Sequence, residues 1–152
     1  MKMQRREVLG ILGAAAGSTL LPQSAATAAE KVIGIGGVFF RARDPKALAQ
    51  WYQEHLGILV VPKSYDEPVW TQQAGPTVFA PFAEKTDYFG DSAKQWMINF
   101  RVADLDRMTR QLEAAGIAVK VDPTTYPNGR FARIHDPEGN AIELWQPMKS
   151  AL

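Results

Sequence analysis

Hydrophobic and polar positions in the first half of the chain predict a strand, a helix and three further strands. Residues 31–42 are β-prone but interrupted by glycines, which predicts a loosened strand. Asp44 and Pro45 then suit the N-cap and first turn of a helix, and Gly57 suits its C-terminal end. The apolar positions between them recur at helical spacing: Leu48, Trp51, Tyr52 and Leu56. Short strands are expected afterwards at 58–62, 69–71 and 77–80.

The second half repeats this order of elements. A strand is expected at 96–102, and Asp104 suits the N-cap of a helix that ends at Gly116. Residues 40–44 (FRARD) align with residues 100–104 (FRVAD) at an offset of 60. The remaining strands are expected at 117–121, 130–135 and 141–146. Because neither unit can bury one face of its sheet alone, the duplication predicts an α+β fold in which the two units pair.

The first 28 residues have the pattern of a secretory signal peptide. Lys2, Arg5 and Arg6 precede an apolar run at 8–21, and small residues follow, with a cleavage site after Ala28. The adjacent arginines are similar to a bacterial twin-arginine signal, with an ordinary Sec signal as the alternative. We therefore expect residues 29–152 to form the mature domain, in the periplasm or secreted. The apolar run is too short for a stable membrane anchor.

Composition narrows the function classes. A chain of 152 residues suits one domain, and the absence of cysteine excludes a disulfide scaffold, a thiolate metal site and a cysteine nucleophile. Removal of residues 1–28 leaves 14 Lys+Arg and 15 Asp+Glu, a net charge of −1, so nucleic acid is not an expected partner. With only two histidines, His55 and His135, a metal site rich in imidazole is difficult to assemble.

Two motifs give the chain a family resemblance. Residues 136–144 (DPEGNAIEL) and the helix pattern from Asp44 to Gly57 resemble the vicinal oxygen chelate superfamily of glyoxalase, bleomycin-resistance and extradiol-dioxygenase-like proteins. The resemblance implies two βαβββ modules that form a cupped, half-open barrel around one cavity. Module one would span about 32–82, a connector 83–95 and module two about 96–147. It also implies a homodimer.

The metal ligands of the superfamily are mostly replaced in this sequence. The resemblance implies ligands seven residues before each helix-capping Asp and at the glutamate of the closing hairpin. These positions are Gly37, Met97 and Glu143 here, so glycine and methionine replace the usual histidines. A lone carboxylate does not hold a catalytic divalent ion, which takes about three protein ligands. We therefore expect no metal or other cofactor, with Zn, Ni, Mn or Fe as the alternative.

Strand alternation predicts which side chains face the cavity. Glu143 would pair with Arg133, act as a general base, or persist as a remnant of a metal site. Three arginines are expected on the cavity face, Arg41, Arg101 and Arg133, and they would bind an anion or lie in solvent. The polar-aromatic stretch at 81–92 is a linker or a lid over the cavity. The predicted ligand contacts are Phe39, Arg41, Met97, Asn99, Arg101, Phe131, Arg133 and Trp145.

Three functional hypotheses follow from this sequence. The favoured one is an exported protein that binds a small, largely apolar organic molecule between its modules without a metal. The second is an enzyme, either a glyoxalase-like lyase or isomerase or a dioxygenase, with a metal or with Glu143 as an acid/base catalyst. The third is a fold kept for dimerisation through its sheet edges.

Overall fold

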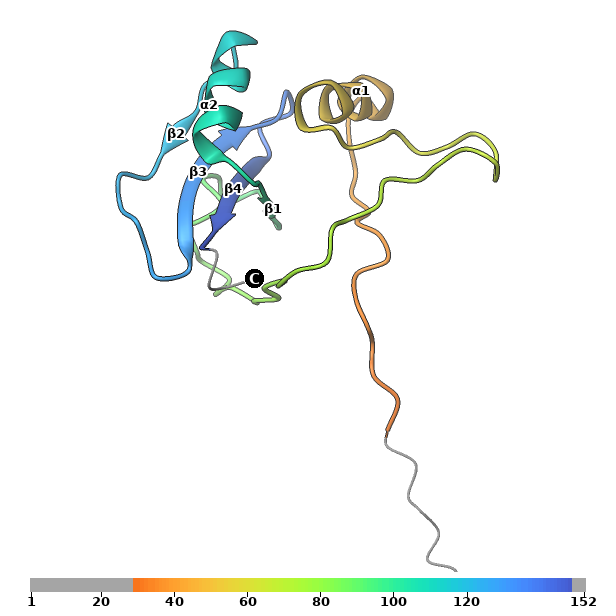
Figure 1. The fold of residues 1–152 in the computed structure, drawn as a ribbon, viewed down its shortest axis with the longest axis horizontal. Helices are drawn as coiled ribbons and strands as arrows, with labels where there is room; N and C mark the ends of the chain where they lie inside the picture. The colour runs from red at the N-terminus through yellow and green to blue at the C-terminus, as the bar shows by residue number, and fades with distance from the viewer. Residues whose placement is uncertain (1–28, 149–152) are drawn as a thin grey trace, which may run out of the picture. The chain divides into compact units, whose positions relative to one another are not determined.

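The computed structural model describes residues 29–148, so the predicted signal peptide at 1–28 lies outside the described residues. The chain divides into two units, Met1–Val38 and Phe39–Leu152. In the first unit, residues 29–38 are exposed and form neither helix nor strand. The second unit contains the helices and strands labelled in Figure 1. No helix in the described part of the chain is long and apolar enough to span a bilayer.

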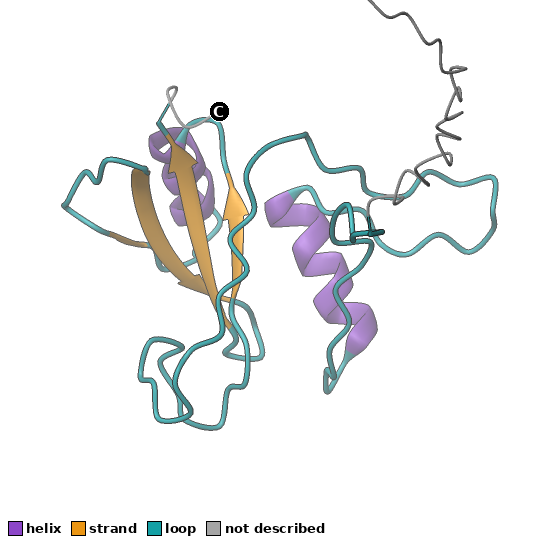
Figure 2. Cartoon of the chain, turned by 90° about the horizontal axis from the view of Figure 1, so that it is seen from below, coloured by secondary structure: helices purple, strands orange, loops and turns teal. Residues whose placement is uncertain are grey.

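The second half forms the βαβββ order that the sequence predicts. Its elements are β1 (Ile98–Arg101), α2 (Leu105–Ala114), β2 (Lys120–Val121), β3 (Gly129–His135) and β4 (Ala141–Pro147). The strands make one sheet in the order β1-β4-β3-β2 (Figure 2). β1 is parallel to β4, while β3 is antiparallel to both β2 and β4. The fold class is therefore α+β, as predicted, and the sheet is mixed.

One face of this sheet and helix α2 share the hydrophobic core. Asp104 caps α2 by accepting a hydrogen bond from the Arg107 N–H at 2.9 Å. The helix then turns Leu105 and Leu112 toward the sheet, where both are fully buried. The sheet contributes alternate residues of β3 and β4 to the same cluster: Ala132, Ile134, Ile142 and Leu144. Burial of each large aliphatic side chain stabilises the fold by about 1.5–3 kcal/mol.

The first half forms its predicted helix, α1 (Pro45–Leu56). The Asp44 carboxylate accepts a hydrogen bond from the Ala47 N–H at 3.0 Å. Gly57 ends the helix at φ 70°, a left-handed conformation that favours glycine, and its N–H donates to the Gln53 carbonyl. These caps are local, which is why the sequence predicts both ends of the helix.

The four segments of the first half that the sequence favours as strands differ from that expectation. Residues 29–97 contain α1 but no strand, and the segments at 31–42, 58–62, 69–71 and 77–80 are extended or irregular. Many of their apolar side chains are exposed, with Phe39 95% and Phe79 88% accessible. β-propensity reflects packing on a neighbouring strand rather than a backbone preference. Without a partner in the described structure, these segments form no ladder.

Aromatic contacts connect the two halves of the second unit. The Phe40 ring lies 4.5 Å from the Trp96 ring and 6.5 Å from the Tyr52 ring of α1. The Trp70 ring meets the Phe100 ring of β1 edge-on at 6.3 Å. Phe40 thus turns toward the helix, as strand alternation predicts for this position.

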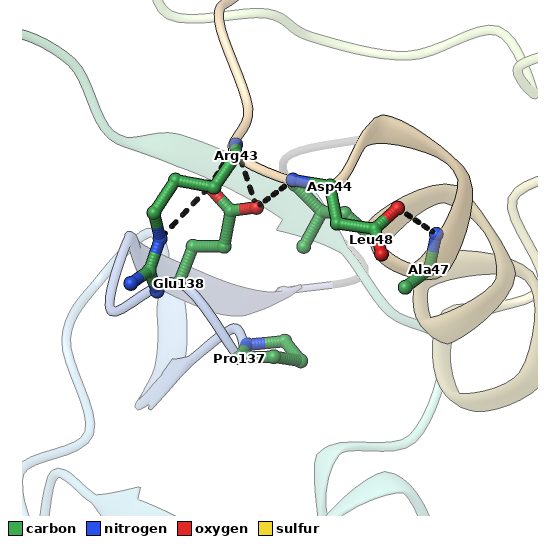
Figure 3. A pocket seen from close by; sticks show the side chains of 6 residues that line it. All are labelled: Arg43, Asp44, Ala47, Leu48, Pro137 and Glu138. Atoms are coloured by element: carbon green, nitrogen blue, oxygen red, sulfur yellow. Dashed lines mark hydrogen bonds and ion pairs between the residues drawn. The ribbon is translucent and has the colours of Figure 1, made fainter.

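Polar contacts attach the start of α1 to the β3–β4 hairpin. The Glu138 carboxylate accepts hydrogen bonds from the backbone N–H groups of Arg43 and Asp44 at 2.9–3.0 Å (Figure 3). These bonds hold the pKa of Glu138 below its usual value of 4.5. The hairpin carboxylate therefore satisfies N–H groups at the helix entry that have no partner within the helix.

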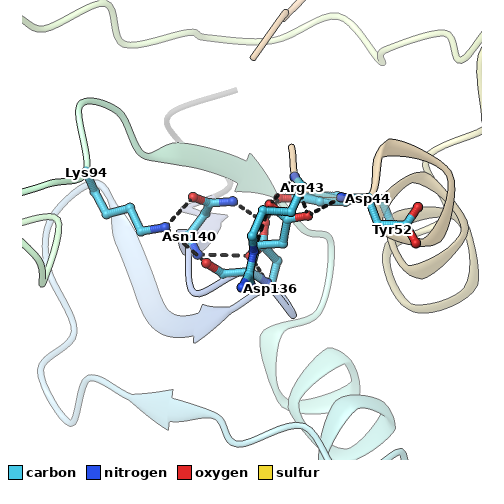
Figure 4. Close-up of polar contacts among 7 residues, drawn as sticks. Arg43, Asp44, Tyr52, Lys94, Asp136 and Asn140 are labelled. Carbon is cyan, nitrogen blue, oxygen red and sulfur yellow. Dashed lines mark hydrogen bonds and ion pairs between the residues drawn. The ribbon is translucent and has the colours of Figure 1, made fainter. Parts of the chain in front are cut away.

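A buried carboxylate makes the second attachment of α1. The Tyr52 hydroxyl of α1 donates to Asp136 Oδ2 at 3.0 Å, and Asn140 Nδ2 donates to the same oxygen (Figure 4). Asp136 Oδ1 accepts the N–H groups of Glu138 and Asn140. Lys94 Nζ donates to Asn140 Oδ1 at 2.9 Å. Burial and the neighbouring Asp136 raise the pKa of Tyr52, so its hydroxyl stays a donor.

Candidate functional site

The face of the sheet opposite α2 carries the polar and aromatic side chains that alternation predicts for the cavity. Glu143 on β4 lies in register with Asn99 on β1 and with Arg133 on β3. Trp145, two residues after Glu143 on β4, lies in register with Arg101 on β1 and with Phe131 on β3. Because register partners project to the same side of a sheet, these six side chains share one face.

Glu143 is the centre of a compact hydrogen-bond cluster on this face. Its Oε1 accepts hydrogen bonds from the Tyr88 hydroxyl at 2.7 Å and from Arg133 Nη2 at 3.3 Å. Its Oε2 accepts from Asn99 Nδ2 at 2.7 Å. The Glu143 side chain is 12% exposed, so this largely buried carboxylate is compensated by one cation and two neutral donors.

Tyr88 enters the cluster from the connector between the two halves. Its backbone carbonyl accepts a hydrogen bond from Arg133 Nη1 at 2.6 Å, and the guanidinium lies over its ring, 4.6 Å from the centroid. The Phe82 ring stacks against the Tyr88 ring at 5.2 Å with an interplanar angle of 18°. Burial raises the pKa of Tyr88, and the hydrogen bond to Glu143 raises it further, so the phenol keeps its proton at neutral pH.

A cavity of about 500 Å³ opens beside this cluster. That volume is in the range of small-molecule sites. Tyr88, Arg133 and Glu143 form its polar wall, and Lys120 and Asp122 add one charge of each sign. Its complete lining is Asp87, Tyr88, Lys120, Val121, Asp122, Pro123, Phe131, Ala132, Arg133 and Glu143.

A second, smaller hollow of about 330 Å³ lies at the start of α1 (Figure 3). It is bordered by Arg43, Asp44 and Glu138 together with apolar side chains of the helix and hairpin. Both carboxylates there already accept backbone hydrogen bonds that cap or position α1. The hollow therefore belongs to the attachment of the helix rather than to a binding site.

The cavity does not include every residue that the sequence predicts as a ligand contact. Phe131 and Arg133 line the cavity. Asn99 does not line it but donates a hydrogen bond to Glu143, which does. Arg101 instead donates to the carbonyls of Gln73 and Ala74. Trp145 is buried, its ring lies parallel to the Phe131 ring at 6.2 Å between centroids, and its indole N–H donates to the Asn128 carbonyl at 2.8 Å.

The three remaining predicted positions lie outside the cavity lining. Phe39 and Arg41 are exposed, and Met97 is half-buried directly before β1. Gly37 belongs to the first unit of the chain and is exposed. The roles of Phe39, Arg41 and Met97 as ligand contacts remain predictions.

Tyr88, Lys120 and Asp122 are cavity residues that the sequence did not single out as ligand contacts. The polar-aromatic character of the connector marks Tyr88 as part of a candidate lid. Lys120 and Asp122 are at and just beyond the two-residue strand β2, where periodicity gives no signal.

The chemistry around Glu143 does not fit a divalent metal ion. Its neighbours are a guanidinium, a phenol and an amide nitrogen, all of which donate hydrogen bonds to its two oxygens. His135 is exposed at the end of β3, and His55 packs against Trp51 on α1. Within residues 29–148, no group of three or more His, Cys, Asp or Glu side chains could hold a metal ion.

Comparison with known proteins gives one family match. A family model described as a glyoxalase-like domain matches residues 37–145 of the chain. Among curated proteins, none matches.

Twenty-one chains of solved structures are similar to this chain, and three of them are compared with it as follows. A glyoxalase/bleomycin resistance protein from Streptomyces sp. CB03234 is 36% identical over 34% of this chain and 46% of its own, with a TM-score of 0.31. This chain thus spans less than half of that protein. The antibiotic binding protein TnmS3 from the same organism is 25% identical over 69% and 88%, with a TM-score of 0.43. A glyoxylase/bleomycin resistance protein/dioxygenase domain from Frankia sp. EAN1pec is 21% identical over 78% and 100%, with a TM-score of 0.46.

Proposed function

Because the chain belongs to the glyoxalase-like domain family and has its α+β fold, we propose that it binds a small, largely apolar organic molecule. The ligand occupies the cavity beside Glu143, and no metal ion takes part. Small-molecule sites combine apolar walls with a few placed polar groups, and this cavity has both.

The hydrogen bonding of Glu143 carries this proposal. In the metal-dependent members that the sequence resembles, the equivalent glutamate is a metal ligand. In this chain its oxygens already accept three hydrogen bonds, and Arg133 compensates its charge. A metal ion would have to displace these donors and lie beside the guanidinium, with one carboxylate as its ligand. A lyase, isomerase or dioxygenase that depends on such an ion is therefore not proposed.

The walls of the cavity favour an apolar ligand body. Val121, Pro123, Phe131 and Tyr88 contribute apolar groups to the cavity lining. Lys120 and Asp122 carry opposite charges, so they give no net preference for an anion or a cation. The polar groups of Glu143 and Arg133 would then orient the ligand.

A fluorescence titration with N-phenyl-1-naphthylamine, a neutral apolar dye, tests this function. The protein should bind the dye saturably, and Phe131→Ala should weaken binding at least about 10-fold because the ring lines the cavity. Phe79→Ala is the matched control, since this exposed ring does not line the cavity. Equal effects of the two substitutions, or no saturable binding, would contradict the proposal.

We also propose that the N-terminal 28 residues direct export and that the domain acts in the periplasm or outside the cell as a homodimer. N-terminal sequencing of the protein from the periplasmic fraction should begin at Ala29. Replacement of both Arg5 and Arg6 by lysine should stop export if the route is the twin-arginine one.

Light scattering of the purified protein tests the homodimer.

A further inference from the structure

The side chain of Tyr88 lies in the binding site like a bound aromatic molecule. Its hydroxyl donates to Glu143 Oε1 at 2.7 Å. One face of its ring meets the Arg133 guanidinium at 4.6 Å, and the Phe82 ring stacks against it at 5.2 Å. A carboxylate, a cation and an aromatic ring therefore contact one phenol, with each group in a favourable geometry.

Tyr88 occupies a place in the fold from which its ring can be exchanged. It belongs to a loop rather than to a strand or helix, and the residue is 42% exposed. Gly90, two residues on, has φ 84°, a conformation that gives the loop a pivot without side-chain strain. The Arg133 bond to the Tyr88 backbone carbonyl does not involve the ring, so the ring can leave while that bond remains.

Arg133 has hydrogen-bonding capacity that Tyr88 leaves unused. Its Nη1 and Nη2 atoms donate to the Tyr88 carbonyl and to Glu143. Its Nε atom is buried and has no hydrogen-bond partner within the described structure. A buried donor without a partner is unfavourable.

We propose that the site recognises a hydroxylated aromatic ring, which replaces the Tyr88 phenol on Glu143 and Arg133, so that Tyr88 competes with the ligand. This inference rests on the proposed function and names the chemical class of its ligand. The ligand hydroxyl donates to the Glu143 carboxylate, and the ligand ring covers the guanidinium.

The acceptor character of Glu143 sets the selectivity. A carboxylate requires a donor, so a ring that carries a hydroxyl is preferred over the same ring without one. An ordinary phenol has a pKa of about 10 and keeps its proton at neutral pH. A carboxylic acid of similar size is ionised at neutral pH and then has no hydrogen-bond donor to offer the Glu143 carboxylate.

Substitution of Tyr88 by alanine, with 4-methylphenol as the probe, tests the inference. Removal of the ring deletes the internal competitor and leaves space of the same shape as the probe. Calorimetric titration should show 4-methylphenol binding at least about 10-fold more tightly to Tyr88→Ala than to the wild type. Tyr88→Phe keeps the ring but loses the hydroxyl, so its affinity should lie between the two. Tyr65→Ala, at a fully exposed tyrosine, is the matched control and should bind like the wild type.

Two further titrations test the role of the hydroxyl. Toluene, which lacks the hydroxyl, should bind Tyr88→Ala at least about 10-fold more weakly than 4-methylphenol. Addition of Glu143→Gln to Tyr88→Ala should remove most of this difference, because the charged acceptor is lost. Thermal unfolding of each variant verifies that it is folded.

The possible failures separate this inference from the proposed function. Equal binding of toluene and 4-methylphenol to Tyr88→Ala would overturn hydroxyl recognition, and equal affinity in wild type and Tyr88→Ala would overturn competition by Tyr88. In both cases the dye would still bind the wild type if the proposed function is correct. Failure of the dye and of both probes to bind would overturn the proposed function together with the inference.

Discussion

Glu143 and Arg133 are the residues on which the chemistry of this site depends. The Glu143 side chain is 12% exposed and the Arg133 side chain 24%, so water compensates their charges only in part. In such surroundings an ion pair contributes little net stability, but the loss of one partner leaves an uncompensated charge. The pair should therefore show strong coupling when its members are changed one at a time and together.

A double-mutant cycle measures this coupling. Arg133→Met should lower the free energy of unfolding by about 1–3 kcal/mol, because Glu143 loses its cation. The double variant Arg133→Met/Glu143→Gln should be less destabilised than the sum of the two single variants. Urea unfolding supplies all four free energies.

The exposed ion pair between Arg130 and Asp106 is the matched control for this cycle. Its atoms approach to 2.8 Å, closer than those of Arg133 and Glu143, but both partners are more accessible. The coupling from Arg130→Met and Asp106→Asn should stay below about 1 kcal/mol. Equal coupling in the two cycles would contradict the view that burial controls the Glu143 pair.

At the residue scale, the sequence predicted the shared face but not every contact on it. Strand alternation placed Asn99, Phe131, Arg133 and Glu143 together because a period of two is a local property of the backbone. Tyr88 comes from a loop, and its approach to Glu143 depends on how that loop returns to the sheet. No local pattern encodes such a return.

The attachment of α1 to the β3–β4 hairpin is the main feature at the scale of elements. The turn sequence Asp136-Pro137-Glu138-Gly139-Asn140 supplies two carboxylates, one that accepts the Tyr52 hydroxyl and one that accepts the N–H groups at the helix entry. This explains physically why the motif combines acidic residues with a tight turn. It holds a helix of the first half on a hairpin of the second.

Tyr52→Phe tests the buried attachment. The substitution removes one of four donors to Asp136, a buried carboxylate, and should lower the free energy of unfolding by about 1–3 kcal/mol. Tyr65→Phe is the matched control because that tyrosine is fully exposed, and its effect should be within about 0.5 kcal/mol of zero. Chemical unfolding with both variants supplies the comparison, and equal small effects would show that the Tyr52 bond contributes little.

The attachment through Glu138 predicts a pH dependence. The pKa of Glu138 in the folded state lies below its usual 4.5, because the N–H groups of Asp44 and Arg43 stabilise the charged form. Its contribution is therefore complete above that usual value and is lost as the pH falls through the folded pKa. The difference in melting temperature between wild type and Glu138→Gln should be constant from about pH 6 to 8 and shrink below about pH 4. A difference that grows on acidification would contradict this sign.

Helices were more predictable than strands for a physical reason. Both helices begin at an aspartate whose carboxylate caps a nearby N–H, so the signal lies within a few residues. The strands of the second half were predicted because alternation and turns agree there. The first-half segments have β-prone sequences, but a ladder needs a partner from elsewhere in the chain, and composition does not specify it.

At the scale of the whole molecule, the family match and the βαβββ unit of the second half agree on the fold, while the proposed function depends on what differs from the family. The closing hairpin and both helix caps follow the pattern that the sequence resembles. The difference lies at Gly37, Met97 and the donors around Glu143. The central claim is that this glutamate takes part in organic recognition rather than metal binding.

Elemental analysis of the untagged protein, purified without chelator from cells supplied with manganese, iron, nickel and zinc, tests this claim most directly. The account predicts less than about 0.1 equivalent of any of these metals, with no difference between wild type and Glu143→Gln. About one equivalent of a single metal in the wild type, lost in Glu143→Gln, would contradict it.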